Sequence, residues 1–299
     1  MNIVRIYELF PTEADCLAHV EKVRWAGTPV CPYCKASRST PLPKENRYHC
    51  NACNTTFSVT VGTIFHHTHL PLQKWFLALS IVLNAKKGLS AHQLARDLEV
   101  HKNTGWRMAM QIRKAMAESD QRELLTGIVE MDETYIGGKP RRGNSGSGSQ
   151  GPAKKATGGR GTNKTPVVGM VQRGGEIRAK VMRKYQLTAK NLSALVRSNV
   201  DIGNATLHTD QYKGYLRIKN FMEHKVVNHS IWYVAQDGTH TNSIESFWAL
   251  LKRGIVGQYH KVSFRHLPRY IDEFSYRYNH RHVDDLFALT LARAVGATS

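Results

Sequence analysis

The chain has 299 residues, of which 41% are hydrophobic and 22% are charged, and its formal net charge is +19. This composition is ordinary for a soluble globular protein, and the length favours more than one domain. The charge indicates a polyanionic partner, although lysines scattered over a solvated surface are the plainer explanation. No apolar stretch is long enough to span a membrane, and the N-terminus lacks the pattern of a signal peptide, so we expect a cytoplasmic protein.

Residues 1–62 are predicted to form a short helix, over residues 12–25, followed by a zinc ribbon. Four of the five cysteines fall into two Cys-x-x-Cys pairs that are fifteen residues apart. Pairs at this spacing are typical of a structural zinc site in which four thiolates surround one ion. Redox-active pairs and free thiols are the alternatives. The predicted zinc ligands are Cys31, Cys34, Cys50 and Cys53.

Residues 63–125 are predicted to be a helical segment that binds DNA. One helix follows Ser90 and a second runs from Lys102 to Met116, which are the proportions of a helix-turn-helix motif. A plain αα-hairpin is the alternative, because Gly105 is unfavourable inside a recognition helix. Four side chains at the start of the second helix could reach a DNA groove or the phosphates: Lys102, Asn103, Thr104 and Arg107.

Residues 126–299 are predicted to form a third domain, a mixed β-sheet with helices on its faces. Apolar alternation indicates three meandering strands, then strands and helices in alternation, then two helices. We expect strands at residues 128–136, 167–172, 177–182, 206–210 and near 224–229, and helices at 187–200, around 212–216, at 243–253 and at 267–278. The predicted fold class is therefore a multidomain α+β or α/β protein.

A flexible basic loop is predicted at residues 139–164, inside the third domain. It holds seven glycines and seven lysines or arginines but no acidic or aromatic residue, so it cannot bury a core. Its charge favours a loop that closes over a phosphate backbone. An insertion without a function is the alternative.

Three carboxylates in the third domain are candidate metal ligands. Asp132 lies midway along the first strand, Asp210 ends the fourth strand, and Glu245 lies in the helix at 243–253. The crossover between the strands can bring Asp210 alongside Asp132. Phosphodiester chemistry needs an activated oxygen and charge neutralisation, which two hard cations held by carboxylates supply. We therefore expect two Mg²⁺ ions per active site, which Mn²⁺ can replace.

The neighbours of Asp132 on its strand divide between two faces. Side chains alternate along a strand, so Glu130 shares the face of Asp132 and Glu133 points to the opposite face. Glu130 could support the site without touching a metal, or it could form a salt bridge with an arginine.

Glu245 also has a purely structural interpretation. The pattern Asn242-x-x-Glu245 is that of a capping box, in which the glutamate only completes the start of the helix. Along the same helix, Trp248 and Lys252 follow Glu245 on a stripe beside the buried face. We expect these two side chains to contact DNA next to the metals.

In this combination the sequence resembles a DDE-type insertion-sequence transposase with an N-terminal zinc ribbon. The similarity rests on the two cysteine pairs and on three further motifs, and it extends from about Trp25 to Tyr278. The resemblance implies a ribonuclease-H-like catalytic domain and metal-dependent cutting and joining of DNA, with Asp132, Asp210 and Glu245 as the acidic triad. The motifs are Val-Glu-Met-Asp-Glu-Thr-Tyr-Ile-Gly-Gly at 129–138, Leu-His-Thr-Asp-Gln-Tyr at 207–212 and Asn-Ser-Ile-Glu-Ser-Phe-Trp-Ala-Leu-Leu-Lys at 242–252.

The expected function is therefore a transposase that binds the double-stranded ends of a mobile element and transfers them to target DNA. Two ends imply a homodimer or a larger homo-oligomer on the DNA, working in the bacterial cytoplasm in association with the nucleoid. A DNA-binding regulator with an inactive catalytic domain is one alternative. A ribonuclease-H-like nuclease that cuts without joining is the other.

Overall fold

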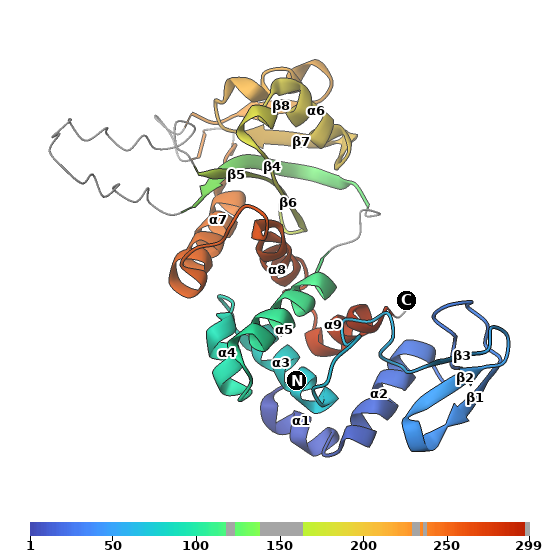
Figure 1. Cartoon of the computed structure of the whole chain (residues 1–299). Helices are drawn as coiled ribbons and strands as arrows, with labels where there is room; N and C mark the ends of the chain where they lie inside the picture. Colours follow the sequence, from blue (N-terminus) through green and yellow to red (C-terminus); the bar gives the residue numbers. More distant parts are fainter. Residues whose placement is uncertain (118–122, 138–163, 229–233, 236–237, 297–299) are drawn as a thin grey trace, which may run out of the picture. The chain divides into compact units, whose positions relative to one another are not determined.

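The computed structural model describes residues 1–117, 123–137, 164–228, 234–235 and 238–296 (Figure 1). The chain divides into two compact units, one made of Met1–Ala117 with His282–Ser299 and the other of Glu118–Arg281. Apart from Lys164, the basic loop predicted at 139–164 falls outside the described residues. Within the described part of the chain, no helix has both the length and the apolar character needed to cross a bilayer.

The first unit contains the predicted ribbon. Helix α2 (Glu13–Trp25) begins with a capping box at Thr12, and Trp25 at its end packs against the ribbon core. The ribbon is a three-stranded antiparallel sheet in sequence order, with Cys31, Cys50 and Phe57 fully buried. Its strands are β1 (Ser39–Leu42), β2 (Arg47–Cys50) and β3 (Thr55–Phe57).

The helical part of the first unit includes a helix from the far end of the chain. α9 (Leu286–Val295) packs against α2, α3 (Leu72–Asn84) and α5 (Lys102–Ala115), and the rings of Phe76 and Phe287 meet edge to face at 5.7 Å. The predicted division into three domains, which placed 126–299 together, therefore differs from the structure at its C-terminal end. The further helices here are α1 (Ile3–Leu9) and α4 (Ala91–Asp97).

Gly105 brings α4 and α5 close together. A Cβ atom at this position would lie 2.7 Å from Cβ of Ala95 and 2.9 Å from the carbonyl oxygen of Ala91. The glycine that is unfavourable for an isolated helix is therefore required by the contact between the two helices. Gly105 is therefore no argument against a recognition helix at α5.

The second unit is built on a five-stranded mixed sheet in the order β6-β5-β4-β7-β8. β4 is central; it pairs antiparallel with β5 and parallel with β7. This arrangement confirms the predicted mixed sheet and the crossover that brings the fourth strand beside the first. The strands are β4 (Leu125–Ile136), β5 (Thr165–Gln172), β6 (Ile177–Val181), β7 (Val200–Thr209) and β8 (His224–Val226).

Helices cover both faces of this sheet (Figure 1). On one face Val129 and Met131 pack with Leu192 of α6 (Ala189–Arg197). On the other, a second apolar cluster joins β5 to α7 (Asn242–Gly254) and α8 (Leu267–Asn279). Side chains alternate between the two faces along β4. Glu130 and Asp132 therefore point to the other face, towards α7.

The helix expected around 212–216 is not formed. Two short 3₁₀ turns, Lys213–Tyr215 and Ile218–Asn220, occupy this region. The carboxylate of Asp210 accepts a hydrogen bond from the backbone N–H of Tyr212 at 3.0 Å. An aspartate side chain that binds the backbone two residues later favours a turn over a helix start.

Candidate active site and metal centres

Asp132, in the middle of β4, lies beside Asp210, the residue that follows the end of β7. Met131 pairs with Thr209 in the register of the two parallel strands, so the residue after each of them is an aspartate at the same level. Carboxylate oxygens of Asp132, Glu133 and Asp210 all lie within 4.8 Å of one another. The structure thus brings together two of the three carboxylates predicted from the sequence and adds one that was not.

Glu133 points to the opposite face of β4 from Asp132, as side-chain alternation predicts, although the sequence analysis did not count it among the metal ligands. Its Oε2 accepts a hydrogen bond of 2.6 Å from the hydroxyl of Tyr215, whose ring is buried on the α6 side of the sheet. The adjacent pair Asp132-Glu133 was the available signal. Although the two side chains leave β4 on opposite faces, their carboxylate oxygens come within 4.8 Å of each other.

Trp248 supports Asp132 and is not exposed to DNA. Its ring is only 3% exposed, and its Nε1–H donates a hydrogen bond of 3.1 Å to Oδ2 of Asp132. The ring lies over Gly169, the residue opposite Asp132 on β5, where a Cβ atom would come within 2.7 Å of it. The prediction that Trp248 contacts DNA is therefore wrong, because its ring is buried. Lys252 is exposed, as a DNA contact requires.

Glu245 lies in the first turn of α7 and does not form the capping box that was the alternative to its role as a metal ligand. The N-cap is Thr241 rather than Asn242, and it makes no side-chain cap hydrogen bond. Instead, the hydroxyl of Thr241 donates to Oε1 of Glu245 at 3.0 Å. The charge of Glu245 is one of the causes that raise the pKa of Asp132, which places it beside the cluster.

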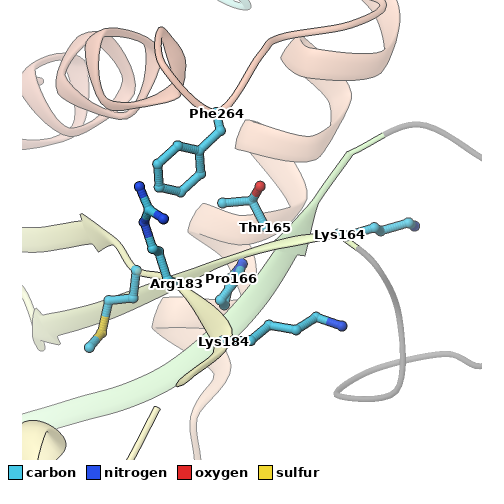
Figure 2. A pocket seen from close by; sticks show the side chains of 7 residues that line it. Lys164, Thr165, Pro166, Arg183, Lys184 and Phe264 are labelled. Atoms are coloured by element: carbon cyan, nitrogen blue, oxygen red, sulfur yellow. The ribbon is translucent and has the colours of Figure 1, made fainter. Parts of the chain in front are cut away.

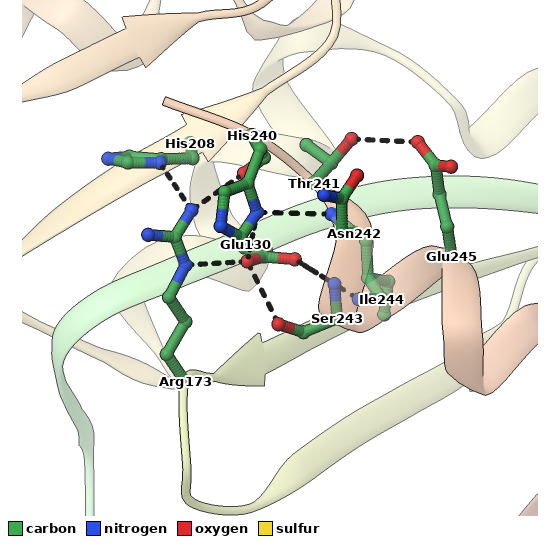
Figure 3. Close-up of polar contacts among 9 residues, drawn as sticks. All are labelled: Glu130, Arg173, His208, His240, Thr241, Asn242, Ser243, Ile244 and Glu245. Carbon is green, nitrogen blue, oxygen red and sulfur yellow. Dashed lines mark hydrogen bonds and ion pairs between the residues drawn. The ribbon is translucent and has the colours of Figure 1, made fainter. Parts of the chain in front are cut away.

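A fully buried glutamate ties α7 to the sheet (Figure 3). Glu130 accepts backbone hydrogen bonds from Ser243 at 2.8 Å and Ile244 at 3.1 Å, and a third from the Ser243 hydroxyl at 3.0 Å. These are the N–H groups that a helix leaves without partners at its N-terminus, where a negative charge is stabilised. Glu130 therefore fixes the start of the helix that carries Glu245.

The charge of Glu130 is balanced by Arg173, which confirms the salt bridge that was one of two alternatives. Nε of Arg173 donates to Oε1 of Glu130 at 2.7 Å, and its Nη2 reaches the carbonyl oxygen of His240 at 3.0 Å. The same Nη2 lies 3.3 Å from Nδ1 of His208. Burial and the neighbouring arginine lower the pKa of His208, so its neutral ring can accept this hydrogen bond.

Burial and neighbouring negative charges leave Asp132 only partly ionised at neutral pH when no cation is bound. Burial and the charge of Glu133, with smaller contributions from Asp210 and Glu245, raise the pKa of Asp132 from 3.8 to about 7. The folded protein therefore holds this proton more tightly than the unfolded chain does. The resulting stabilisation is present at low pH and is lost as the pH rises towards 7.

We expect the metal-free protein to lose stability between about pH 4 and pH 7 by an amount on the order of a few kcal/mol from this carboxyl. Asp132→Asn should flatten that part of the profile, because the amide does not titrate. The measurement is thermal or urea unfolding against pH, in chelator, for the wild type and the variant. Parallel profiles for the two proteins would contradict the raised pKa.

The four cysteines of the ribbon form a cluster with the dimensions of a zinc site. Sγ atoms are 3.7 Å apart for Cys31 and Cys53 and 3.5 Å apart for Cys34 and Cys50. Tetrahedral zinc with Zn–S bonds of about 2.3 Å requires sulfur atoms about 3.8 Å apart. Backbone N–H groups of Cys53 and Ala52 lower the pKa of Cys50 to about 6, which favours the thiolate that a metal needs.

Cys50→Ala should remove the zinc, of which the wild type should carry about one ion per chain. The N-terminal ribbon should then unfold at a lower temperature while the second unit is unaffected. Metal analysis of the purified proteins makes the measurement. Cys16→Ala is the matched control, because Cys16 is buried but lies outside the cluster, and it should retain the zinc. Full occupancy in Cys50→Ala would refute the assignment.

The predicted DNA-contacting face of α5 is exposed. Lys102, Asn103 and Arg107 are exposed and Thr104 is half-buried, while the buried side of the helix is formed by other residues, including Met108 and Ile112. Trp106, in the same segment of the helix, is 44% exposed.

The order of the five strands, with β4 central and helices on both faces, defines a ribonuclease-H-like fold. Residues 124–279, just over half of the 299-residue chain, match the model of the ISXO2-like transposase domain, and residues 11–56 match a transposase zinc-ribbon domain. The chain belongs to this transposase family.

Individual proteins are similar to the chain at lower identity. A protein described as uncharacterized in transposable element ISH50 of Halobacterium salinarum is 28% identical over 276 residues, which cover 90% of this chain and 91% of that protein. Structures of a pre-cleavage Mos1 transpososome and a Mos1 strand transfer complex are each 15% identical and cover 74% of this chain and 78% and 75% of theirs. Their TM-scores, 0.30 and 0.31, are too low to carry a conclusion about this chain.

Proposed function

We propose that this protein binds the ends of a mobile DNA element and catalyses metal-dependent strand cleavage and strand transfer. The observation that carries the proposal is the convergence of Asp132 and Asp210, with Glu245 beside them, at one end of a ribonuclease-H-like sheet. Carboxylates that crowd together without a cation raise one another's pKa, which is costly to a fold unless function requires it.

The carboxylates fit hard divalent cations. Ligand oxygens of Asp132, Glu133 and Asp210 lie close enough together to share an ion, and oxygen is the ligand that Mg²⁺ and Mn²⁺ prefer. Two such cations, when bound, would activate the attacking oxygen and neutralise charge at the phosphorus. We assign Asp132, Asp210 and Glu245 as the ligand set, with Glu133 as a fourth candidate held by Tyr215.

The surrounding residues hold these oxygens in place. Trp248 donates to one oxygen of Asp132, and the backbone of Tyr212 donates to one oxygen of Asp210. Thr241 donates to Glu245. Each donor limits rotation of the carboxylate that it binds. A site whose ligands are already oriented loses less entropy when it binds cations and DNA.

The proposed partner is double-stranded DNA, both the element ends and the target. The net charge of +19 and the exposed face of α5 support this partner. We assign end binding to Lys102, Asn103, Thr104 and Arg107 of α5 and to the exposed Lys252 of α7. Two ends require two active sites, so the working form is a homodimer or a larger homo-oligomer. Chromosomal DNA as substrate places the protein in the cytoplasm, associated with the nucleoid.

The test is a strand-transfer assay with full-length protein, a labelled pre-cut element end and a target plasmid. Joining that requires Mg²⁺ or Mn²⁺ supports the proposal. Cleavage of a flanked end without any joining would make the protein a nuclease, and DNA binding without either reaction would make it a regulator. Ca²⁺ should permit binding with little chemistry, since its looser coordination positions the oxygens poorly.

A further inference from the structure

A hollow of about 370 Å³ lies at one end of the sheet in the second unit, apart from the carboxylate cluster (Figure 2). It forms where β5 begins and β6 has just ended, and the segment before α8 closes it with Phe264. Pro166 and Thr165 line it from the start of β5. This volume suits one small-molecule unit and is far below that of a stacked duplex.

Three cations and one aromatic ring define the chemistry of the hollow. Lys164, Arg183 and Lys184 line it, and none of the described residues around it carries a carboxylate. The guanidinium of Arg183 lies 5.3 Å from the centre of the Phe264 ring. Figure 2 shows that the side chains of Lys164 and Lys184 extend to the same side. The hollow therefore offers two ammonium groups on one side and a ring with a guanidinium on the other.

The exposure of Phe264 needs an explanation. Its ring is 44% exposed while it lines the hollow, so one of its surfaces is accessible to a ligand there. Aromatic rings that stay exposed between cations are the stacking surfaces on which proteins bind unpaired bases, while the cations contact the backbone phosphates. Cation–π contact with Arg183 also holds the ring in position before a ligand arrives.

The hollow lies within reach of a strand held at the acids. Thr165 pairs with Ile136, and Gly169 pairs with Asp132, in the register of β5 and β4. Four residues along a strand span about 13 Å, at about 3.3 Å per residue. A DNA strand rises about 3.4 Å per nucleotide along the helix axis, so a strand at Asp132 reaches the hollow within a few nucleotides.

We propose that this hollow binds one unpaired nucleotide of the DNA strand processed at the acids. The base stacks on Phe264, and the phosphate lies between Lys164 and Lys184. A base within a continuous duplex is already stacked on both sides and cannot use this ring, so the site selects a strand end or a locally opened strand. That the bound strand is the one cut at the acids rests on the proposed function. The binding of an unpaired nucleotide does not depend on catalysis.

The test compares binding of a fluorescein-labelled single-stranded oligonucleotide and of a duplex of the same length to full-length protein. Phe264→Ala should weaken single-strand binding by roughly tenfold, the usual effect of removing one stacking ring. Duplex affinity should change less than about twofold, because paired bases do not use the ring. Phe264→Trp should restore the single-strand affinity, whereas Phe264→Leu, which is apolar but cannot stack, should not.

Two controls make the result specific. Tyr185→Ala removes a ring that is 71% exposed in the same segment but does not line the hollow, and it should have little effect. Lys184→Ala should lower the salt dependence of single-strand binding, while the exposed Lys190→Ala should not.

Two outcomes would overturn the proposal: unchanged single-strand affinity in Phe264→Ala, or an equal loss for single strand and duplex. Unfolding temperatures of each variant show whether any loss reflects misfolding, and the folded Phe264→Leu and Phe264→Trp pair then decides. Because the readout is binding, a wild type without strand transfer would refute the proposed function while leaving this test intact.

Discussion

Asp132→Asn is expected to abolish strand cleavage and strand transfer, by more than about a thousandfold, while end binding stays nearly unchanged. The substitution keeps the shape of the side chain and removes the charge that a cation needs. Asp210→Asn should have the same effect. Each variant is measured by strand transfer of a labelled end and, in parallel, by a gel shift with the same DNA.

Comparing two glutamates identifies the third ligand. If Glu245 completes the set, Glu245→Gln should be inactive, and Glu133→Gln, which keeps a hydrogen-bond acceptor for Tyr215, should retain much of its activity. The reverse result would assign the third ligand to Glu133, the carboxylate within 4.8 Å of both aspartates. Wild-type joining by Asp132→Asn would end the transposase proposal altogether.

Glu130→Gln is expected to destabilise the second unit by about 3 kcal/mol, because a buried charge pair loses one member and α7 loses its anion. For a unit of this size that corresponds to a fall in unfolding temperature of roughly 10 °C. Strand transfer at low temperature, where the protein is still folded, should also require more Mn²⁺, since α7 positions Glu245. Unfolding curves and Mn²⁺ titrations provide the two measurements.

The chain offers a matched control for the charge itself. Glu8 forms a salt bridge with Arg5 at 3.0 Å, but both side chains are more than half exposed, so Glu8→Gln should change stability by less than about 0.5 kcal/mol. Arg173→Met added to Glu130→Gln should cost less than Arg173→Met in the wild type, because the ion pair is already lost and only the hydrogen bonds to His240 and His208 remain to be broken. Full additivity of the two changes would show that the pair is not coupled.

The sheet and the meeting of Asp132 with Asp210 could be predicted because both follow from local patterns. Apolar alternation marked β4, β5 and β6, and the crossover rule placed the fourth strand beside the first. β7 was predicted too short, since its first half, with Asp201, Gly203 and Asn204, has the composition of a turn. Parallel pairing with β4 imposed the strand on those residues.

The residues around the acids could not be predicted, because their partners are distant in sequence. Glu130 lies 113 residues before the backbone N–H of Ser243 that it binds, and no local pattern connects them. Trp248 follows Glu245 on the helix, yet it turns inward because Gly169 leaves room for its ring. α9 has no motif, and only packing against α2 and α3 shows which unit it joins.

The fit of the Trp248 ring against Gly169 makes a residue without any chemistry indispensable. A single methyl group at Gly169 would meet two ring carbons of Trp248 at 2.7 Å and Cδ1 of Ile244 at 2.9 Å. Any side chain at this position therefore forces the Trp248 ring, which is hydrogen-bonded to Asp132, or the Ile244 side chain to shift. A genetic screen for loss of transposition should therefore recover Gly169 alongside the carboxylates, although it binds neither metal nor DNA.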